Sequence, residues 1–361
     1  MLPALLRAHG YETVGFSANP WIAPRTGFDA GFDSLYMSGS PPPQLTFRDP
    51  GMSTLSLDPR FASGQAGLAL RQLNHHIARR GLGEPFFLFI NVIDSHYPYR
   101  SPPNYRFAFG ARKGLAQKLF RTSELALLAG GVTVDPAAIV PLYDATILYV
   151  DAMIGELVKW LLVNGSYDDS MIVVTSDHGE HLGEEGRFSH QLSMEEELLR
   201  VPLIIKYPKN RNAGTVDDDP HVSTVDLYET ILAAAGIESD RSSSGQDLGD
   251  PGITRRDHAV AEYYHSASYL QLLRDKNPSF DVEAHSGPSR VVYTHGYKLT
   301  FRDGDLTRVE GGKGAAISPA LRDRVTEWMK TYRKTVVGPQ KPGPVLDDDF
   351  VERLRAMGYV E

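Results

Sequence analysis

Two short polar segments follow apolar runs of the kind that form buried strands. Asp177 and His178 follow Met171 to Thr175, and His96 follows Phe86 to Ile93. In open α/β sheets, ligands bind beyond the carboxyl ends of the strands. Because the chain turns there, neighbouring side chains leave the strict alternation of a strand, and a carboxylate and an imidazole can converge on one cation. Asp177 and His178 are therefore candidate metal ligands.

Each of these residues also has a purely structural interpretation. An aspartate after a strand often caps a turn beside a solvated histidine, and for an isolated Asp177-His178-Gly179 tripeptide that interpretation is preferred. A loop histidine such as His96 or His190 is more often a surface residue or a polar anchor than a catalytic group. Gly179 would let the backbone pass close to a bound ion. Residues elsewhere in the chain are needed to choose between the structural and the functional interpretation.

The composition excludes several classes of protein. The 361 residues carry 37 Lys and Arg against 45 Asp and Glu, for a net charge of −8, whereas a nucleic-acid binder needs a basic excess. There is no cysteine, which excludes disulfides, thiolate metal sites and a cysteine nucleophile on this chain. The longest uninterrupted apolar runs, of which Phe86 to Ile90 is one, are too short to span a bilayer. We expect neither nucleic acid as a partner nor a transmembrane segment.

The elements that must position the polar segments alternate between helix and strand. Apolar residues recur at helical spacing in four segments, and four short apolar runs predict strands. The helices are Leu2 to Gly10, Ala66 to Gly81, Ile139 to Gly165 and Leu227 to Gly236; the strands are Thr13 to Phe16, Phe86 to Ile93, Met171 to Thr175 and Val201 to Ile205. This alternation predicts an α/β fold with a mostly parallel central sheet flanked by helices. Uninterrupted apolar strands are typical of burial on both faces.

The pattern changes from about Gly252. Three short runs suggest antiparallel strands, and a helix follows from Pro319 to Arg333; the runs are Ala259 to Tyr264, Ser289 to Tyr293 and Tyr297 to Phe301. We therefore predict an α/β domain over residues 1–250 and a smaller α+β subdomain over 251–361, which ends in a short helix within Leu346 to Tyr359.

Two further expectations concern side chains away from the strand ends. The loops from Ser38 to Asp58 and from Tyr105 to Val134 are predicted to be irregular and to contribute to a substrate pocket. His75 and His76 stand in a helix beside two arginines and are expected to lie on its solvated face.

Several of these segments resemble segments of the sulfatase family, which belongs to the alkaline-phosphatase-like superfamily. The similarity runs through Tyr143 to Asp151, Ile172 to Glu180, Ser189 to Gln191 and Arg200 to Ile205. It extends to Phe86 to Pro98, Asn19 to Asp33 and Thr224 to Gly236, and the closing segment Phe350 to Tyr359 is similar to tails of bacterial members. These segments cover nearly the whole chain in the order of the family.

The resemblance implies roles for four residues. Asp177 and His178 would be the second pair of metal ligands. His190 would be the active-site histidine near the ester or leaving-group oxygen, and His96 would contact the anionic oxygens of the substrate. The metal is usually calcium in this family, and manganese or zinc in related phosphoesterases; the imidazole of His178 suits the softer ions somewhat better.

The chain also departs from the family pattern at its beginning. Family members open with a strand that ends in paired aspartates, followed by a Cys- or Ser-x-Pro-x-Arg motif whose first residue becomes formylglycine. Here Ser101 to Tyr105, Ser-Pro-Pro-Asn-Tyr, fails at the last position, and Met1 to Tyr11 resembles the helix that follows the missing segment. We expect a chain that is N-terminally truncated relative to the family and is incomplete or inactive as an enzyme by itself.

Three functional hypotheses remain open from the sequence. The first is metal-dependent hydrolysis of a sulfate ester of a small molecule or carbohydrate. The second keeps the superfamily but changes the reaction to a phosphate or phosphonate monoester hydrolase, or a phospho-head-group transferase. The third is a non-catalytic binding protein on a decayed hydrolase scaffold, which the absent nucleophile motif suggests.

Overall fold

The computed structural model describes residues 1–38, 64–130, 132, 134–219, 221–239, 243–264, 267–312 and 316–336. Among these, the chain divides into two compact units. The first comprises Met1–Ser170 and Leu182–Ser189, and the second comprises Met171–His181 and the described residues from His190 onward.

The first unit contains a three-stranded parallel sheet. Strand β1 (Glu12–Ser17) lies between β2 (Ser34–Met37) and β3 (Phe86–Asn91), and Val14 is in register with Ser34 on one side and with Leu88 on the other. Helix α1 (Leu2–Ala8) precedes the sheet, and α2 (Gln65–Arg80) precedes β3. The predicted α/β fold with a parallel sheet is confirmed, although β2 lies in a segment that was not expected to form a strand.

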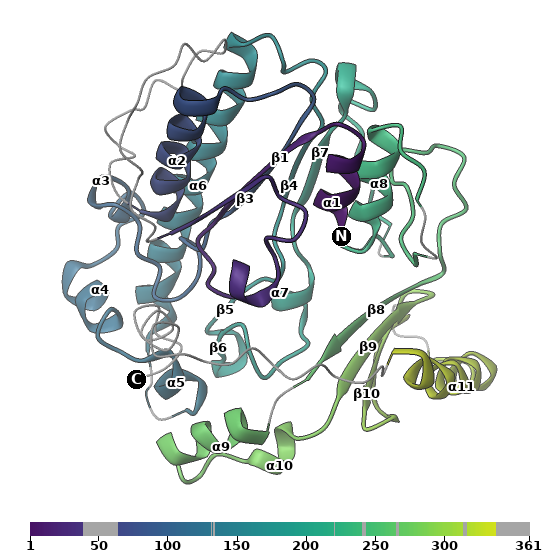
Figure 1. Ribbon diagram of the computed structural model, residues 1–361. Coiled ribbons are helices and arrows are strands. Elements are labelled where there is room, and N and C mark those ends of the chain that lie inside the picture. The colour runs from purple at the N-terminus through teal and green to yellow at the C-terminus, as the bar shows by residue number, and fades with distance from the viewer. Residues whose placement is uncertain are drawn as a thin grey trace. The chain divides into compact units, whose positions relative to one another are not determined.

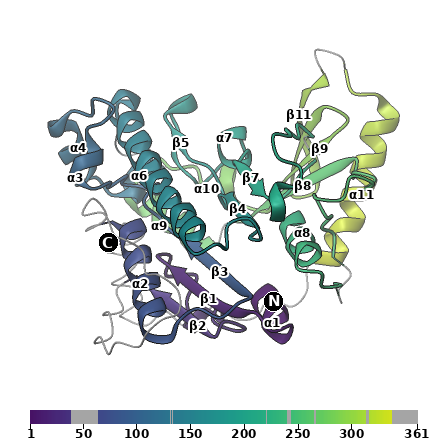
Figure 2. The same cartoon turned by 90° about the horizontal axis from the view of Figure 1, so that it is seen from above.

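The longest helix of the first unit is α6 (Pro136–Val163), which packs against α2 (Figure 1 and Figure 2). Its N-terminus is capped by the Asp135 carboxylate, which accepts from the Ala137 N–H at 3.0 Å. Leu142, Ala145 and Tyr149 are fully buried along it. The helix also contacts α3 (Pro103–Arg106) and α4 (Lys113–Leu119), which with α5 (Glu124–Leu128) form the segment predicted to be irregular.

Among the described residues, α6 alone is long and apolar enough to cross a membrane by length and composition. Only 39% of its most apolar window is buried, but core helices of globular proteins pass the same test. It packs against three other helices, and one helix of this kind does not make a clear transmembrane segment.

The second unit begins with an antiparallel pair of strands. β4 (Ile172–Thr175) pairs with β7 (Leu203–Lys206), with Val173 opposite Ile205. Both strands occupy predicted positions, but their antiparallel pairing departs from the parallel arrangement expected there. The apolar run alone does not encode strand direction, which depends on how the connecting chain returns. Helices α7 (Glu196–Leu199) and α8 (Asp226–Ala234) precede and follow β7.

The second unit also contains the C-terminal antiparallel sheet. Its order is β11-β10-β9-β8, from strands β8 (His258–Tyr263), β9 (Ser289–Thr294), β10 (Tyr297–Arg302) and β11 (Asp305–Gly311). Helix α11 (Pro319–Val336) packs on this sheet through Val325 and Met329, as Figure 1 shows. Two short helices, α9 (Ala267–Lys276) and α10 (Val282–His285), connect β8 to β9. The smaller α+β unit is therefore confirmed, while the boundary near residue 250 stays a prediction.

Two expectations about burial are wrong. β3 and β4 are half-buried rather than buried on both faces, and Thr175 is exposed. In the described part of the chain β3 pairs with β1 alone and β4 with β7 alone, so each is an edge strand. His75 and His76 are buried rather than solvated: the His76 ring bridges the Tyr36 hydroxyl at 2.9 Å and the Glu12 carboxylate at 3.0 Å.

Two other predictions lie outside the described residues: the tail helix within Leu346 to Tyr359, and nearly all of the loop from Ser38 to Asp58.

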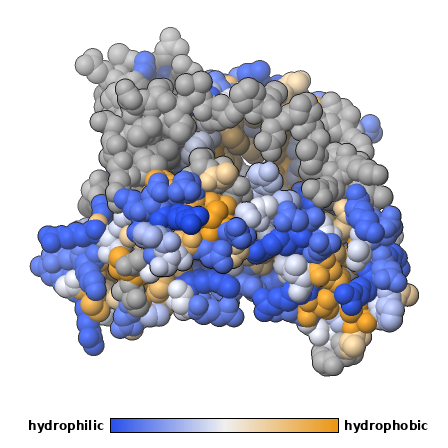
Figure 3. Space-filling view, turned by 90° about the horizontal axis from the view of Figure 1, so that it is seen from below, coloured by the Kyte–Doolittle hydropathy of each residue, from blue (hydrophilic) through white to orange (hydrophobic). Residues whose placement is uncertain are grey.

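On the face drawn in Figure 3, the described residues are mainly hydrophilic, with apolar ones in small groups.

Candidate functional site

Asp177 and His178 stand in a tight turn directly after β4. The Thr175 hydroxyl donates to the Pro202 carbonyl at 2.9 Å, and the Ser176 hydroxyl donates to the His178 carbonyl at 2.6 Å. The His178 N–H donates to the Asp177 carboxylate at 3.1 Å. These bonds hold the turn in one conformation, with both side chains partly open to solvent at 67% and 38% exposure.

The hydrogen bond of the His178 ring defines which nitrogen is available to a ligand. Its Nδ1 lies 2.9 Å from the Gly179 carbonyl oxygen, and a carbonyl can only accept, so Nδ1 carries the proton. The lone pair of the neutral ring is then on Nε2, which lies 3.8 Å from Oδ1 of Asp177. A metal-binding histidine usually has its second nitrogen bonded in this way. The donor set therefore fits two ligands of one divalent cation.

Gly179 also meets a steric requirement within the fold. A Cβ at this position would lie 1.9 Å from the Glu197 carbonyl oxygen, and the Gly179 N–H donates to the Leu198 carbonyl at 2.8 Å. The glycine is required here because the backbone passes against α7. The Gly179–Leu198 hydrogen bond thus connects the turn with the two candidate ligands to α7.

Ion pairs and a hydrogen bond connect helix α7 to the C-terminal sheet. The buried Lys298 ammonium on β10 lies 3.0 Å from Glu195 and 3.3 Å from Glu196, at the start of α7. Arg308 on β11 pairs with Glu195 at 2.8 Å, and the Tyr293 hydroxyl donates to Glu196 at 2.6 Å. The second unit therefore links β4, α7 and the C-terminal sheet around the candidate ligands.

His190 lies beside His178 in the same unit. The two imidazole rings stack with centroids 4.3 Å apart and planes 10° from parallel. The structure thus brings together three of the four residues that the sequence singled out.

His96 lies in the first unit, in the turn after β3. Its Nδ1 lies 2.8 Å from the Tyr97 carbonyl oxygen, which fixes the proton on Nδ1 and leaves Nε2 for other partners. The turn is held at Asp94, whose carboxylate accepts from the Gln65 and Ala66 N–H groups at the start of α2, at 3.0 and 2.8 Å. Burial raises the pKa of Asp94 to about 6, against the lowering effect of these bonds.

Glu124 is a candidate residue that the sequence did not reveal. It is 1% exposed, at the first position of α5, and accepts a hydrogen bond from the Ser189 hydroxyl. Burial raises its pKa to about 7, which the bond from Ser189 partly opposes. A single glutamate in a segment without clear periodicity gives no signal beyond Ser123, the cap that precedes it.

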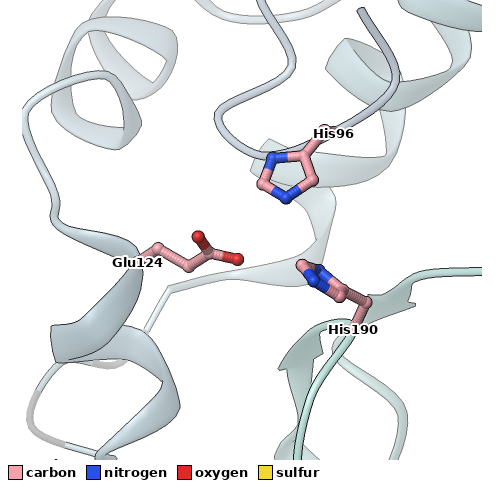
Figure 4. A group of neighbouring side chains, drawn as sticks. All are labelled: His96, Glu124 and His190. Atoms are coloured by element: carbon pink, nitrogen blue, oxygen red, sulfur yellow. The ribbon is translucent and has the colours of Figure 1, made fainter. Parts of the chain in front are cut away.

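In Figure 4 the Glu124 carboxylate points toward the His96 ring, which belongs to the same unit. One carboxylate oxygen of Glu124 and one ring nitrogen of His96 lie within 4.8 Å of each other.

The family model described as "Sulfatase" matches residues 1–237. The chain belongs to the sulfatase family. A second model, described as "N-sulphoglucosamine sulphohydrolase, C-terminal", matches residues 183–300. The predicted membership of the sulfatase family within the alkaline-phosphatase-like superfamily is confirmed.

Two curated relatives illustrate the range of the family. An N-acetylglucosamine-6-O-sulfatase of Bacteroides thetaiotaomicron is 40% identical over 131 residues, which is 35% of this chain and 23% of the relative. A multifunctional alkaline phosphatase superfamily protein of Trinickia caryophylli is 33% identical over 122 residues, 33% of this chain and 23% of the relative. The matched part of the chain thus spans about a quarter of the length of these relatives.

Solved structures show the same fold. A phosphonate monoester hydrolase from Silicibacter pomeroyi has a TM-score of 0.63 at 18% identity, covering 96% of this chain and 83% of that one. A protein in complex with its substrate D-glucosamine-2-N,6-O-disulfate has a TM-score of 0.61 at 19% identity, covering 92% and 81%. At this identity the likeness concerns the fold alone.

Proposed function

We propose that this sulfatase-family protein is a metal-dependent hydrolase of sulfate esters, with a sulfated carbohydrate as its substrate class. The observation that carries the proposal is the convergence of Asp177, His178 and His190 beyond the end of β4. The substrate class is supported by the N-acetylglucosamine-6-O-sulfatase relative and by the two matching family models.

Asp177 and His178 would supply two ligands of the divalent ion, through Oδ1 and Nε2. Such an ion stabilises negative charge on the oxygens of the sulfate group. Calcium is the ion we propose from the family. Manganese and zinc are the alternatives, because the imidazole nitrogen of His178 is a better ligand for them than for calcium.

The two other histidines would act on the substrate itself. In the charged state, Nε2 of His96 can donate to an anionic oxygen, because Nδ1 is already committed to the Tyr97 carbonyl. His190 would stand near the ester oxygen, where an imidazolium can protonate the leaving alcohol. Its stacking on His178 would keep it next to the proposed ion.

A phosphate or phosphonate monoester hydrolase is the second candidate. The observation that favours it is the match to the multifunctional alkaline phosphatase superfamily protein, at 33% identity. The two reactions share a metal site and a tetrahedral anion, so the residues described here serve either one.

The test uses the protein purified from its natural source and compares release of sulfate from a sulfated N-acetylglucosamine with cleavage of a phosphonate monoester. We expect sulfate release that requires a divalent ion. Cleavage of the phosphonate alone would move the assignment to the second candidate. Neither reaction, with metal still bound, would leave only the non-catalytic binding protein.

A variant pair controls for loss of folding. Asp177→Asn should abolish the activity. Asp257→Asn should retain it, because Asp257 and His258 form a second adjacent Asp-His pair with 69% and 38% side-chain exposure. There, however, the His258 Nδ1 faces the carboxylate at 2.8 Å and its ring packs on Trp328. Equal loss in both variants would refute the metal role of Asp177.

A further inference from the structure

The residue that precedes His190 has an unusual backbone conformation. Ser189 has φ +65°, in the left-handed region that a residue with a Cβ seldom adopts. It is also completely buried, at the end of the two-residue strand β6 (Phe188–Ser189), which pairs with β5 (His181–Leu182). Such a conformation persists only where its surroundings hold it in place, and it is common beside functional groups.

The group that holds Ser189 is Glu124. The Ser189 hydroxyl donates to the Glu124 carboxylate, and both side chains are buried. Both residues belong to the first unit, so the bond connects two of its segments, α5 and β6.

Glu124 itself is fixed by the segment that carries His96. The hydroxyl of Tyr97, the next residue, donates to the Leu119 and Thr122 carbonyls at 3.0 and 2.7 Å. The first carbonyl is at the end of α4 and the second lies two residues before α5 begins. The Ser123 hydroxyl then caps the helix by accepting from the Ala126 N–H at 3.2 Å. The backbone that carries Glu124 is therefore held in place by hydrogen bonds other than the one with Ser189.

We infer that the hydrogen bond from Ser189 to Glu124 holds Ser189 in its left-handed conformation and thereby sets the direction in which the chain presents His190. Glu124 is then a positioning residue for His190, and its carboxylate also faces His96, as Figure 4 shows. The relevance to catalysis rests on the proposed function, whereas the backbone geometry at Ser189 does not.

Four single variants of the full chain separate this role from a general loss of packing. Glu124→Gln keeps an acceptor oxygen and should retain the conformation, whereas Glu124→Ala removes it and should lose the conformation. Ser189→Ala removes the hydroxyl and should lose it as well. Ser189→Gly also removes the hydroxyl, but glycine adopts positive φ without strain, so this variant should retain the conformation better than Ser189→Ala.

The first readout is NMR of the deuterated chain. The backbone chemical shifts of Ser189 report its φ, and the ring signals of His190 and His178 report whether the two imidazoles remain stacked. We expect wild-type-like signals in Glu124→Gln, shifted ring signals in Glu124→Ala and Ser189→Ala, and partial recovery in Ser189→Gly. Wild-type ring signals in Glu124→Ala, or a Ser189→Gly variant no better than Ser189→Ala, would overturn the inference.

The second readout is binding of inorganic sulfate, followed by the same ring signals. We expect sulfate affinity to fall about tenfold or more in Glu124→Ala, because a small misplacement of a binding group is costly, and to stay within about twofold in Glu124→Gln. If the wild-type chain binds no sulfate, the proposed function fails while the NMR comparison still tests the inference. If the wild type binds sulfate and Glu124→Ala binds it equally well, the inference fails alone.

Discussion

At the scale of single residues, two histidines of the candidate site share one local arrangement. In both His178 and His96 the Nδ1–H donates to the carbonyl of the next residue, Gly179 or Tyr97, which fixes the proton on Nδ1. The sequence predicted these residues because each follows an apolar strand. It could not predict the tautomers, since they depend on how each turn orients its carbonyl groups.

Glu124 predicts a pH dependence of stability. Its pKa is about 4.5 in the unfolded chain and about 7 in the fold because of burial. Between these values the unfolded chain loses the proton first, so the stability contributed by the neutral carboxyl is lost as the pH rises from about 4.5 to about 7. Glu124→Gln should therefore gain stability relative to wild type over this range, by about 3 kcal/mol at most.

Denaturant unfolding at pH 4.5 and at pH 8 measures this difference, with Glu327→Gln on exposed α11 as the control. We expect the gap between Glu124→Gln and wild type to grow with pH and that of the control to stay constant. A gap that does not change between the two pH values would contradict the burial of an ionisable carboxyl at this position.

Gly179 predicts a steric effect that a matched glycine does not share. Gly179→Ala would push a Cβ into the Glu197 carbonyl and should destabilise the chain by about 2 kcal/mol. Gly155, within α6, has open space at its Cβ position, so Gly155→Ala should be neutral or stabilising by up to about 1 kcal/mol. Thermal unfolding should show a lower melting temperature for Gly179→Ala and an unchanged or higher one for Gly155→Ala.

At the scale of elements, α7 connects the candidate ligands to the C-terminal sheet. Its backbone accepts the Gly179 N–H, and its first residues pair with Lys298 and Arg308. Lys298 is 9% exposed at its side chain while its partner Glu195 is 23% exposed. Solvent therefore screens the attraction between Lys298 and Glu195 less than it screens that of a surface ion pair.

Lys298→Met tests this connection. Removing the ammonium leaves Glu195 with a weaker set of partners and should cost about 2 kcal/mol in unfolding free energy. Because α7 holds the turn with Asp177 and His178, metal affinity should also fall, by about threefold to tenfold. Lys330→Met, which removes an exposed pair on α11, should change neither quantity. Unchanged metal affinity in a destabilised Lys298→Met protein would show that α7 does not position the ligands.

Most elements were predictable because their apolar periodicity is a local property. The strands β1, β3, β4 and β7 lie where their apolar runs indicated, and α6 follows its helical spacing. The antiparallel pairing of β4 with β7 was not predictable, because it depends on the return path of the chain. Helix α5 was missed because five residues are too few to show a period, and the Glu124 interactions were missed with it.

At the scale of the whole molecule, the family was predictable and the division of the chain was not. Motifs spread along the chain identified the sulfatase family, which the model match over residues 1–237 confirms. The segment Leu182–Ser189 belongs to the first unit but interrupts the sequence of the second, so neither unit is continuous in sequence. The change of pattern near Gly252 could only suggest a single boundary. The Asp177-His178 turn and the His96 turn consequently belong to different units.

The central claim is that Asp177 and His178 hold a divalent cation, and calorimetric titration of the full chain with calcium and with manganese tests it most directly. We predict binding of one ion, with a dissociation constant on the order of 0.1–1 mM for calcium, as expected for a site with few protein ligands. Binding should be lost in Asp177→Asn and in His178→Ala, and retained in Asp257→Asn. Binding that survives both substitutions in the 177–178 pair, or is lost equally in Asp257→Asn, would contradict the account.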